Sequence, residues 1–207
     1  MIRTLAFWSA VLGYGLLLIM IVAGGAAWPG YSHVSQFISE LGAGGAPHAR
    51  VINLGGFLPV GVLLTLFALL SAFLAPRSGL RVAGFLMLAL FAVGYLAAAF
   101  FPCDVGCRPT APSASQMIHN LAGLGGYLGA PIGLILLGVA ARRWPDAAWL
   151  SPLAFACAAV AFVAFVVMLG EPPIGGLVQR VLEGSVALWS LAYASTVRRS
   201  PARPGTV

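Results

Sequence analysis

The chain has 207 residues, of which 60% are hydrophobic and only 8% are charged. A soluble domain carries about 25% charged residues, so a water-soluble fold of this size would have too little polar surface to cover itself. Together with a mean hydropathy of +0.98, this composition predicts a polytopic membrane protein. It excludes a soluble enzyme, a nucleic-acid-binding domain and a disordered tail, and the net charge of +6 needs a membrane explanation.

Charge-free apolar runs predict an all-α fold with six transmembrane helices. A helix needs about 20 apolar residues to cross the hydrocarbon core of a bilayer. Runs of that kind lie at about 5–28, 51–75, 82–102, 116–141, 148–170 and 174–196. We expect them to form one membrane domain over residues 1–197, followed by a cytoplasmic tail over 198–207.

Arginine predicts the orientation of these helices, since the chain contains no lysine. One side of the membrane would carry Arg3, Arg77, Arg81, Arg142, Arg143, Arg198, Arg199 and Arg203. The other side has Arg50 and Arg108, and Arg180 falls inside the sixth span. By the positive-inside rule, both termini of this multi-pass protein face the cytoplasm, with the inner membrane as its location. The basic surplus also favours anionic membrane lipids as partners, without any nucleic acid.

The first external loop carries the pattern of a short helix. Ser32 is a suitable N-cap and Gly42 a suitable end. Between them, four apolar residues recur at helical spacing, namely Val34, Phe37, Ile38 and Leu41. The pattern predicts a short external helix that lies in the membrane interface or tucks toward the bundle.

Polar side chains gather on the predicted external half of the protein, where each is costly at membrane depth and needs a partner or a purpose. They come from the first loop, the end of the third span, and the fourth and sixth spans. The candidates are His33, Ser39, Glu40, Asp104, His119, Asn120, Arg180 and Glu183. We expect Glu40, Asp104, His119 and Arg180 to converge in one external pocket.

Two of these residues have an obvious chemistry. His119 would act as general acid or base, oriented by Asp104 or Glu40, because a histidine titrates close to neutral pH. The alternative is a core histidine bonded to a backbone carbonyl. Arg180 would hold an anionic head group with its forked guanidinium, or else pair with Glu183, three residues later on the same helix face. The chain lacks metal-ligand spacings such as HxxxH or CxxC, so we predict neither a metal nor a cofactor.

Cys103 and Cys107 bracket Asp104 in the second external loop. Disulfides persist on the extracytoplasmic side of a membrane, so we expect a Cys103–Cys107 bridge that fixes the rim of the pocket. A redox-active pair is the weaker alternative, because three residues intervene where redox motifs have two. Cys157 is expected to be a small core residue.

The fourth span contains a GxxxGxxxG pattern at Gly125, Gly129 and Gly133. Small residues at this spacing allow helices to approach closely. The pattern predicts tight packing within the bundle, with formation of a homo-oligomer as the alternative. Pro59 and Pro131 are expected to kink the second and fourth spans.

Several of these segments together resemble a bacterial membrane family catalogued as domain of unknown function 998. They are YSHVSQFISELG at residues 31–42, FPCD at 101–104, His119-Asn120 and Gln179-Arg180. The Ser-Glu-Leu-Gly element after the first span is the most specific part, and the similarity covers nearly the whole chain. That family is distantly similar to the Frag1/DRAM/Sfk1 membrane proteins, some of which are tied to lipid remodelling. The resemblance implies six helices and an outward-facing polar site, without implying an activity.

The functional prediction is therefore a membrane protein that binds or modifies a lipid or amphiphile at the outer leaflet. If it is an enzyme, the prediction is a membrane-embedded lipid hydrolase or transferase. One alternative is a noncatalytic scaffold or regulator. Another is a proton-linked transporter, which would need polar groups in the cytoplasmic halves of the spans, where charged residues occur only near the ends.

Overall fold

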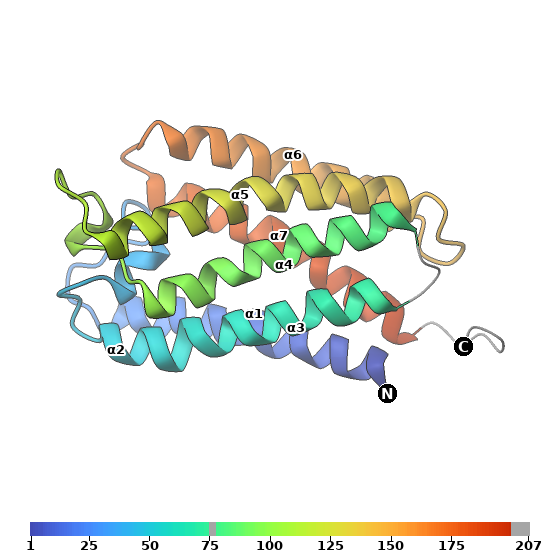
Figure 1. The fold of residues 1–207 in the computed structure, drawn as a ribbon, viewed down its shortest axis with the longest axis horizontal. Coiled ribbons are helices and arrows are strands. Elements are labelled where there is room, and N and C mark those ends of the chain that lie inside the picture. The colour runs from blue at the N-terminus through green and yellow to red at the C-terminus, as the bar shows by residue number, and fades with distance from the viewer. Residues whose placement is uncertain (75–77, 200–207) are drawn as a thin grey trace.

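The computed structural model describes residues 1–74 and 78–199 and shows a bundle of long, roughly aligned helices (Figure 1). The long elements are α1 (Ile2–Ala26), α3 (Leu58–Phe73), α4 (Gly79–Phe100), α5 (Ala114–Ala141), α6 (Leu150–Leu169) and α7 (Gly175–Arg199). The short elements are the 3-10 helices η1 (Ile38–Gly42) and η3 (Val105–Cys107), helix α2 (Ala49–Val51) and the π-helical η2 (Ile52–Phe57). No strand occurs in these two described ranges, so the fold is all-α.

The long helices lie where the apolar runs of the sequence lie. Their ends differ from those runs by at most three residues, as at α1, which begins at Ile2 rather than at residue 5. Helix α2, η2 and α3 are continuous and form one long helix, Ala49–Phe73. The expected end of the second run at residue 75, Arg77, and residues 200–207 of the expected tail lie outside the described residues.

Five of these helices are long and apolar enough to cross a bilayer, namely α1, the α2–α3 helix, α4, α5 and α6. The protein is therefore a multi-pass membrane protein. Helix α7 has 25 residues, as many as α1, and at 1.5 Å per residue it is about 37 Å long. It is less apolar because three polar residues, Gln179, Arg180 and Glu183, lie in its first turns.

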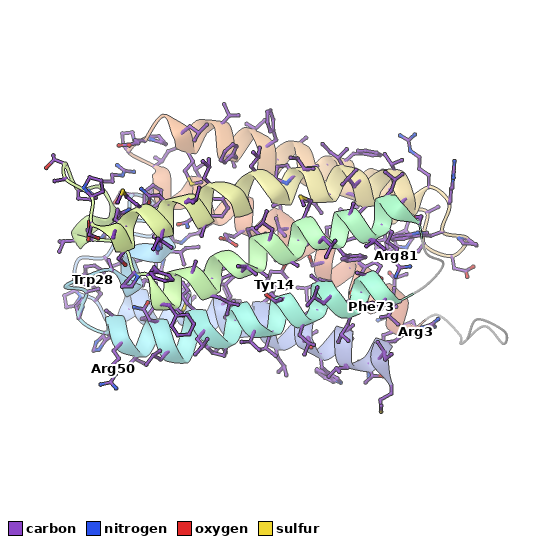
Figure 2. The ribbon with its side chains drawn as sticks, in the orientation of Figure 1. Arg3, Tyr14, Trp28, Arg50, Phe73 and Arg81 are labelled. Atoms are coloured by element: carbon purple, nitrogen blue, oxygen red, sulfur yellow. A yellow bond between two sulfur atoms is a disulfide. The ribbon has the colours of Figure 1, made fainter. Side chains whose placement is uncertain are left out.

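The helices form a closed ring in chain order. Each long helix packs against the next one along the chain, and α7 closes the ring by packing against α1. The start of α1, the end of α3, the start of α4, the loop between α5 and α6 and the end of α7 lie at one end of the bundle (Figure 1). Arg3 and Arg81 are at this end, whereas Trp28 and Arg50 are at the opposite end (Figure 2). The expected site residues come from that opposite end: from the first loop, the loop between α4 and α5, the start of α5 and the start of α7.

Glycines set the close approach of α5 to α4. A Cβ added to Gly133 would lie 2.9 Å from the backbone oxygen of Gly84, and one added to Gly129 would lie 3.3 Å from that of Met87. Gly125 has no such neighbour within 4 Å. Two of the three glycines of the GxxxGxxxG pattern thus pack within the bundle, and Gly125 remains on an open face.

Aromatic side chains fill the half of the bundle nearer the start of α1. The rings of Trp189 and Tyr193 stack at 5.4 Å between centroids, and Phe85 lies 4.8 Å from Tyr193. The indole N–H of Trp189 donates to the backbone oxygen of Leu150 at 3.1 Å. Packed aromatic rings therefore occupy the interior of this half of the bundle.

The helix in the first loop is shorter than expected, and of the two expected positions it takes the one tucked toward the bundle. Residues around Ser32 form a turn, in which Ser35 N–H donates to Ser32 Oγ at 3.3 Å, and only Ile38–Gly42 is helical. Ile38 is 1% exposed and Leu41 2%, whereas Val34 is 49% exposed. The side chains of the helical part point into the bundle rather than toward a membrane interface. Residues 36–42 therefore close the end of the bundle, and we call this segment the loop plug.

The π-helical turn η2 precedes Pro59. Proline has no N–H to bond the carbonyl four residues earlier, and in this turn Leu58 N–H reaches back five residues to Asn53 O. A π-helical turn often marks a functional position. Here it brings Asn53 Nδ2 within 3.0 Å of Gly42 O, which ties the second long helix to the loop plug.

Candidate functional site

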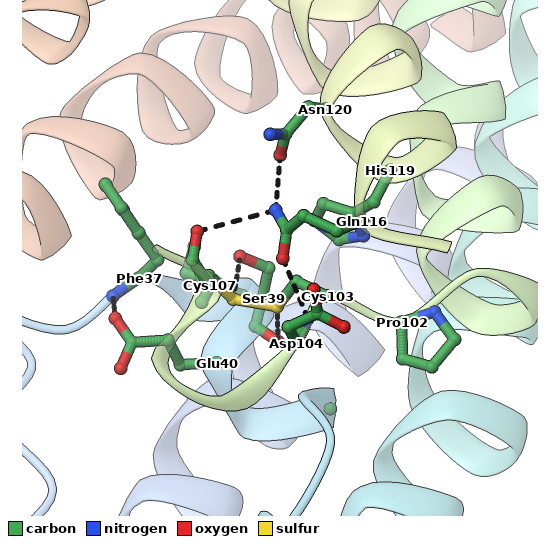
Figure 3. Close-up of a disulfide and its surroundings, with 12 residues drawn as sticks. Phe37, Ser39, Glu40, Pro102, Cys103, Asp104, Cys107, Gln116, His119 and Asn120 are labelled. Atoms are coloured by element: carbon green, nitrogen blue, oxygen red, sulfur yellow. Dashed lines mark hydrogen bonds between the residues drawn. A yellow bond between two sulfur atoms is a disulfide. The ribbon is translucent and has the colours of Figure 1, made fainter. Parts of the chain in front are cut away.

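The disulfide loop is held against the start of α5 by one glutamine (Figure 3). The structure confirms the Cys103–Cys107 bridge, with 5.0 Å between the two Cα atoms. Gln116 is fully buried, and its Oε1 accepts from Asp104 N–H at 2.7 Å while its Nε2 donates to Asn120 Oδ1 at 2.7 Å. Gln116 therefore connects the disulfide loop to the expected site residue Asn120, a role the sequence did not indicate.

Asp104 binds Ser113, the N-cap of α5, rather than facing His119. Its carboxylate accepts from the N–H of Ser113 at 2.9 Å and from the hydroxyl of Ser113 at 2.7 Å. These two hydrogen bonds lower the pKa of Asp104. Ser113 in turn accepts from Gln116 N–H at 3.1 Å as the N-cap of α5. Asp104 thus has a structural task at the beginning of α5.

Glu40 is buried inside the loop plug. One carboxylate oxygen accepts from Phe37 N–H at 2.8 Å and the other from Gln36 Nε2 at 3.0 Å. Figure 3 shows it on the side of the plug away from His119. Its task is to cap the 3-10 helix.

Arg180 fastens the first loop to α7. Its guanidinium donates to Tyr31 Oη at 2.7 Å, to His33 Nδ1 at 3.1 Å and to Gln36 O at 2.9 Å. Since an arginine only donates, His33 Nδ1 is the acceptor and this histidine is neutral. Partial burial and the charge of Arg180 both lower the pKa of His33. The two terminal nitrogens of Arg180 are therefore occupied by neutral groups of the protein, and its buried Nε has no hydrogen-bond partner among the described residues.

His119 lies at the rim of a cavity and is held by a backbone carbonyl. Its Nδ1 is 3.0 Å from Phe101 O. A carbonyl accepts only, so Nδ1 carries the proton and Nε2 is left with its lone pair. The expected set of Glu40, Asp104 and His119 is not assembled, because each of these described residues is bonded to a different part of the chain.

The cavity has a volume of about 400 Å³ and lies between α4, α5, α6 and α7, below the loop plug. Most of its wall is apolar, and Phe57, Phe91, Leu124, Phe165, Met168 and Leu169 contribute to it. Its polar rim is made by Ser39, Arg108, His119, Asn120 and Glu171. Of the expected site residues, Ser39, His119, Asn120 and Glu183 line the cavity, whereas His33, Glu40, Asp104 and Arg180 do not.

A chain of hydrogen bonds ends on Glu183 at the inner end of this cavity. Gln179 Oε1 accepts from Ile38 N–H at 2.6 Å, and Gln179 Nε2 donates to Tyr127 Oη at 2.5 Å. The Tyr127 hydroxyl donates to one carboxylate oxygen of Glu183 at 3.0 Å, and the Tyr95 hydroxyl donates to the other. The backbone N–H of Ile38 can only donate, so it binds the amide oxygen of Gln179 and leaves the amide NH2 to donate to Tyr127. The Tyr127 hydroxyl then donates its own proton to Glu183.

The alternative prediction, an ion pair between Arg180 and Glu183, is not seen among the described residues, and Gln179 is the residue connected to Glu183 instead. Gln179 and Glu183, four residues apart, share one helix face and both line the cavity, whereas Arg180 turns to the loop. Sequence reasoning missed Gln179, Tyr95 and Tyr127. The sequence does indicate Gln179, as a polar residue one helical turn before Glu183. It also indicates Tyr95 and Tyr127, as tyrosines within otherwise apolar spans.

Residues with metal-ligating side chains are scattered. Within the part of the chain that the structure describes, no group of three or more His, Cys, Asp or Glu side chains could hold a metal ion. Cys157 is buried and unpaired in α6.

Comparison with known proteins gives one match. A family model described as "Protein of unknown function (DUF998)" matches residues 11–196. No curated protein and no solved structure matches the chain.

Proposed function

We propose that this chain, which belongs to the DUF998 family, holds an amphiphile such as a membrane lipid in the cavity between α4, α5, α6 and α7. One observation carries the proposal: a cavity of about 400 Å³ joins an apolar wall to a polar rim and a polar inner end. Ligand sites are typically cavities of about 300–1,000 Å³ with mostly apolar walls and a few placed polar groups.

The rim residues Ser39, His119 and Asn120 are the proposed contacts for the exposed part of the ligand, and Glu183 is the contact for its buried part. His119 offers one basic nitrogen, Nε2. No carboxylate among the described residues bonds its other nitrogen. Binding is therefore the proposed function, ahead of hydrolysis or transfer, both of which would need a positioned acid–base pair.

We place the rim of the cavity at the outer leaflet and both termini in the cytoplasm. Arg3 and Arg81 lie at the end of the bundle where α1 starts, and Arg50 lies at the other end (Figure 2). Arg142 and Arg143 directly follow α5 at the first of these ends, and Arg108 lies in the loop before α5 at the second. An excess of arginine marks the cytoplasmic side of membrane helices.

A pair of glycine variants in α5 tests this function. A Cβ on Gly123 or on Gly125 would meet no atom within 4 Å, so either position accepts a side chain. Only Gly123 lines the cavity. Gly123→Leu should fill the cavity and lose co-purified amphiphile in native mass spectrometry, whereas Gly125→Leu should retain it.

Equal retention by the wild type and both variants would contradict the proposal. In that case the lipid retained by all three proteins would be bound on the outer surface of the bundle. A noncatalytic scaffold would then explain the protein better.

A further inference from the structure

We propose that the amphiphile held in this cavity is cationic, with an amine or quaternary ammonium group at the inner end against Glu183. The inference rests on the proposed function and names the chemical class of its ligand. It follows from three features of the inner end: the direction of the hydrogen bonds, the charge of the carboxylate and the rings beside the tyrosines that bond it.

The hydrogen-bond direction makes both oxygens of Glu183 acceptors. Tyr127 donates to one oxygen and Tyr95 to the other. Tyr127 is held in this role because Gln179 donates to it from behind. A carboxylate with two oxygens has about four acceptor sites, so two remain, and Glu183 lines the cavity. A ligand that donates hydrogen bonds or carries positive charge fits this arrangement.

No cation of the described residues pairs with this carboxylate. Arg180, three residues before Glu183, directs its guanidinium to Tyr31, His33 and two backbone oxygens. Glu183 is only 5% exposed. A buried charge is costly unless it is paired, so an ammonium group beside Glu183 would stabilise the ionised carboxylate.

Two further rings lie beside the tyrosines that bond this carboxylate. The ring centroid of Phe91 lies 5.7 Å from that of Tyr95 and 6.0 Å from that of Tyr127, and Phe57 lies 6.3 Å from Tyr95. All four rings line the cavity. The faces of aromatic rings attract ammonium groups, and quaternary ammonium ligands are commonly bound in such cages.

The remainder of the cavity suits an alkyl chain. Leu124, Phe165, Met168 and Leu169 form its wall on α5 and α6. An apolar wall favours burial of methylene groups, each worth about 0.8 kcal/mol in transfer from water. A cationic group with an attached alkyl chain therefore matches both parts of the cavity, whereas a small inorganic cation would match only the carboxylate.

The experiment compares three probes with the same chain length: dodecyltrimethylammonium, dodecanol and dodecyl sulfate. Their binding to the purified full-length protein in a nonionic detergent is measured by native mass spectrometry. We expect the cation to bind at least about tenfold more tightly than the other two. Glu183→Gln should remove this preference, so that the variant binds the cation and dodecanol equally. Glu171→Gln, which removes the same charge at the rim, should keep the preference.

Phe91→Leu provides a second variant that leaves the hydrogen-bond chain in place, so the test does not depend on the folding of Glu183→Gln. It should weaken binding of the cation about threefold or more relative to dodecanol, through loss of a ring face. Equal binding of cation and dodecanol to the wild type, or a preference unchanged by Glu183→Gln, would overturn the inference and leave a cavity for neutral amphiphiles. If no probe distinguishes the wild type from Gly123→Leu, the proposed function itself fails.

Discussion

Gln179 is the residue on which the connection between loop plug and cavity depends. Its amide joins Ile38 N–H to Tyr127 Oη and is 6% exposed. Gln179→Ala would leave a buried N–H without a partner, which costs about 1–3 kcal/mol. We expect a clearly lower unfolding temperature in detergent, measured by differential scanning fluorimetry.

Asn120→Ala is the matched control, because this amide is exposed and water can replace its bond to Gln116. Its effect should stay within about 0.5 kcal/mol. Equal losses for the two variants would mean that Gln179 has no special position.

His33 should make the stability of the protein depend on pH. The pKa of His33 is lowered by partial burial and by the charge of Arg180, whose guanidinium donates to Nδ1. Below its ordinary pKa of about 6.5, the unfolded chain therefore binds more protons than the folded one. The free energy of unfolding should fall as the pH drops below that value and level off once the folded state is also protonated.

The measurement is the unfolding temperature from pH 7.5 to 4.5, compared with that of His33→Gln. The variant has no titrating group at this position, so its curve should be flatter across the interval. Parallel curves for the two proteins would show that the contact between His33 and Arg180 does not respond to protonation.

At the scale of elements, the contact between α4 and α5 depends on individual glycines. A Cβ on Gly133 would lie 2.9 Å from Gly84 O and 3.0 Å from Met87 Cβ, both in the facing helix. Gly133→Ala should therefore destabilise the bundle by about 1–3 kcal/mol through overpacking. Gly125→Ala meets open space and should be neutral or stabilising by up to about 1 kcal/mol, because alanine favours the helix.

Thermal unfolding in the same detergent compares these two variants directly. If Gly125→Ala were the destabilising one and also changed the mass of the detergent-solubilised particle, the open face of α5 would be a contact between copies of the chain.

Helices were predictable from the sequence because their signal is local, whereas the site depends on rotation about helix axes. A charge-free run of sufficient length is enough to locate α4 or α6. Whether Arg180 or Gln179 faces the cavity depends on the rotation of α7 about its own axis. The apolar runs of the sequence do not determine that rotation. For the same reason Asp104 and Glu40 were expected beside His119, although local caps at Ser113 and Phe37 engage them.

At the scale of the whole molecule, the orientation in the membrane is testable from two loops. Ala111 precedes α5 at the cavity end, and Ala148 precedes α6 at the end where α1 starts; both are exposed. In a Cys157→Ala background, a membrane-impermeant thiol reagent should label Ala111→Cys on intact cells. Ala148→Cys should react only after permeabilisation. The reverse pattern would invert the proposed orientation and place the rim of the cavity in the cytoplasm.

The π-helical turn couples the length of the second long helix to that of the loop before it. An α-helix turns about 100° per residue, so deletion of one residue within Ile52–Phe57 would restore α-helical geometry and rotate the preceding turn by that angle. Asn53 would then leave Gly42 O, 3.0 Å away in the intact chain, and the loop plug would lose its anchor on this helix. A shortened helix would therefore need a compensating insertion in the loop to keep the cavity closed at its end.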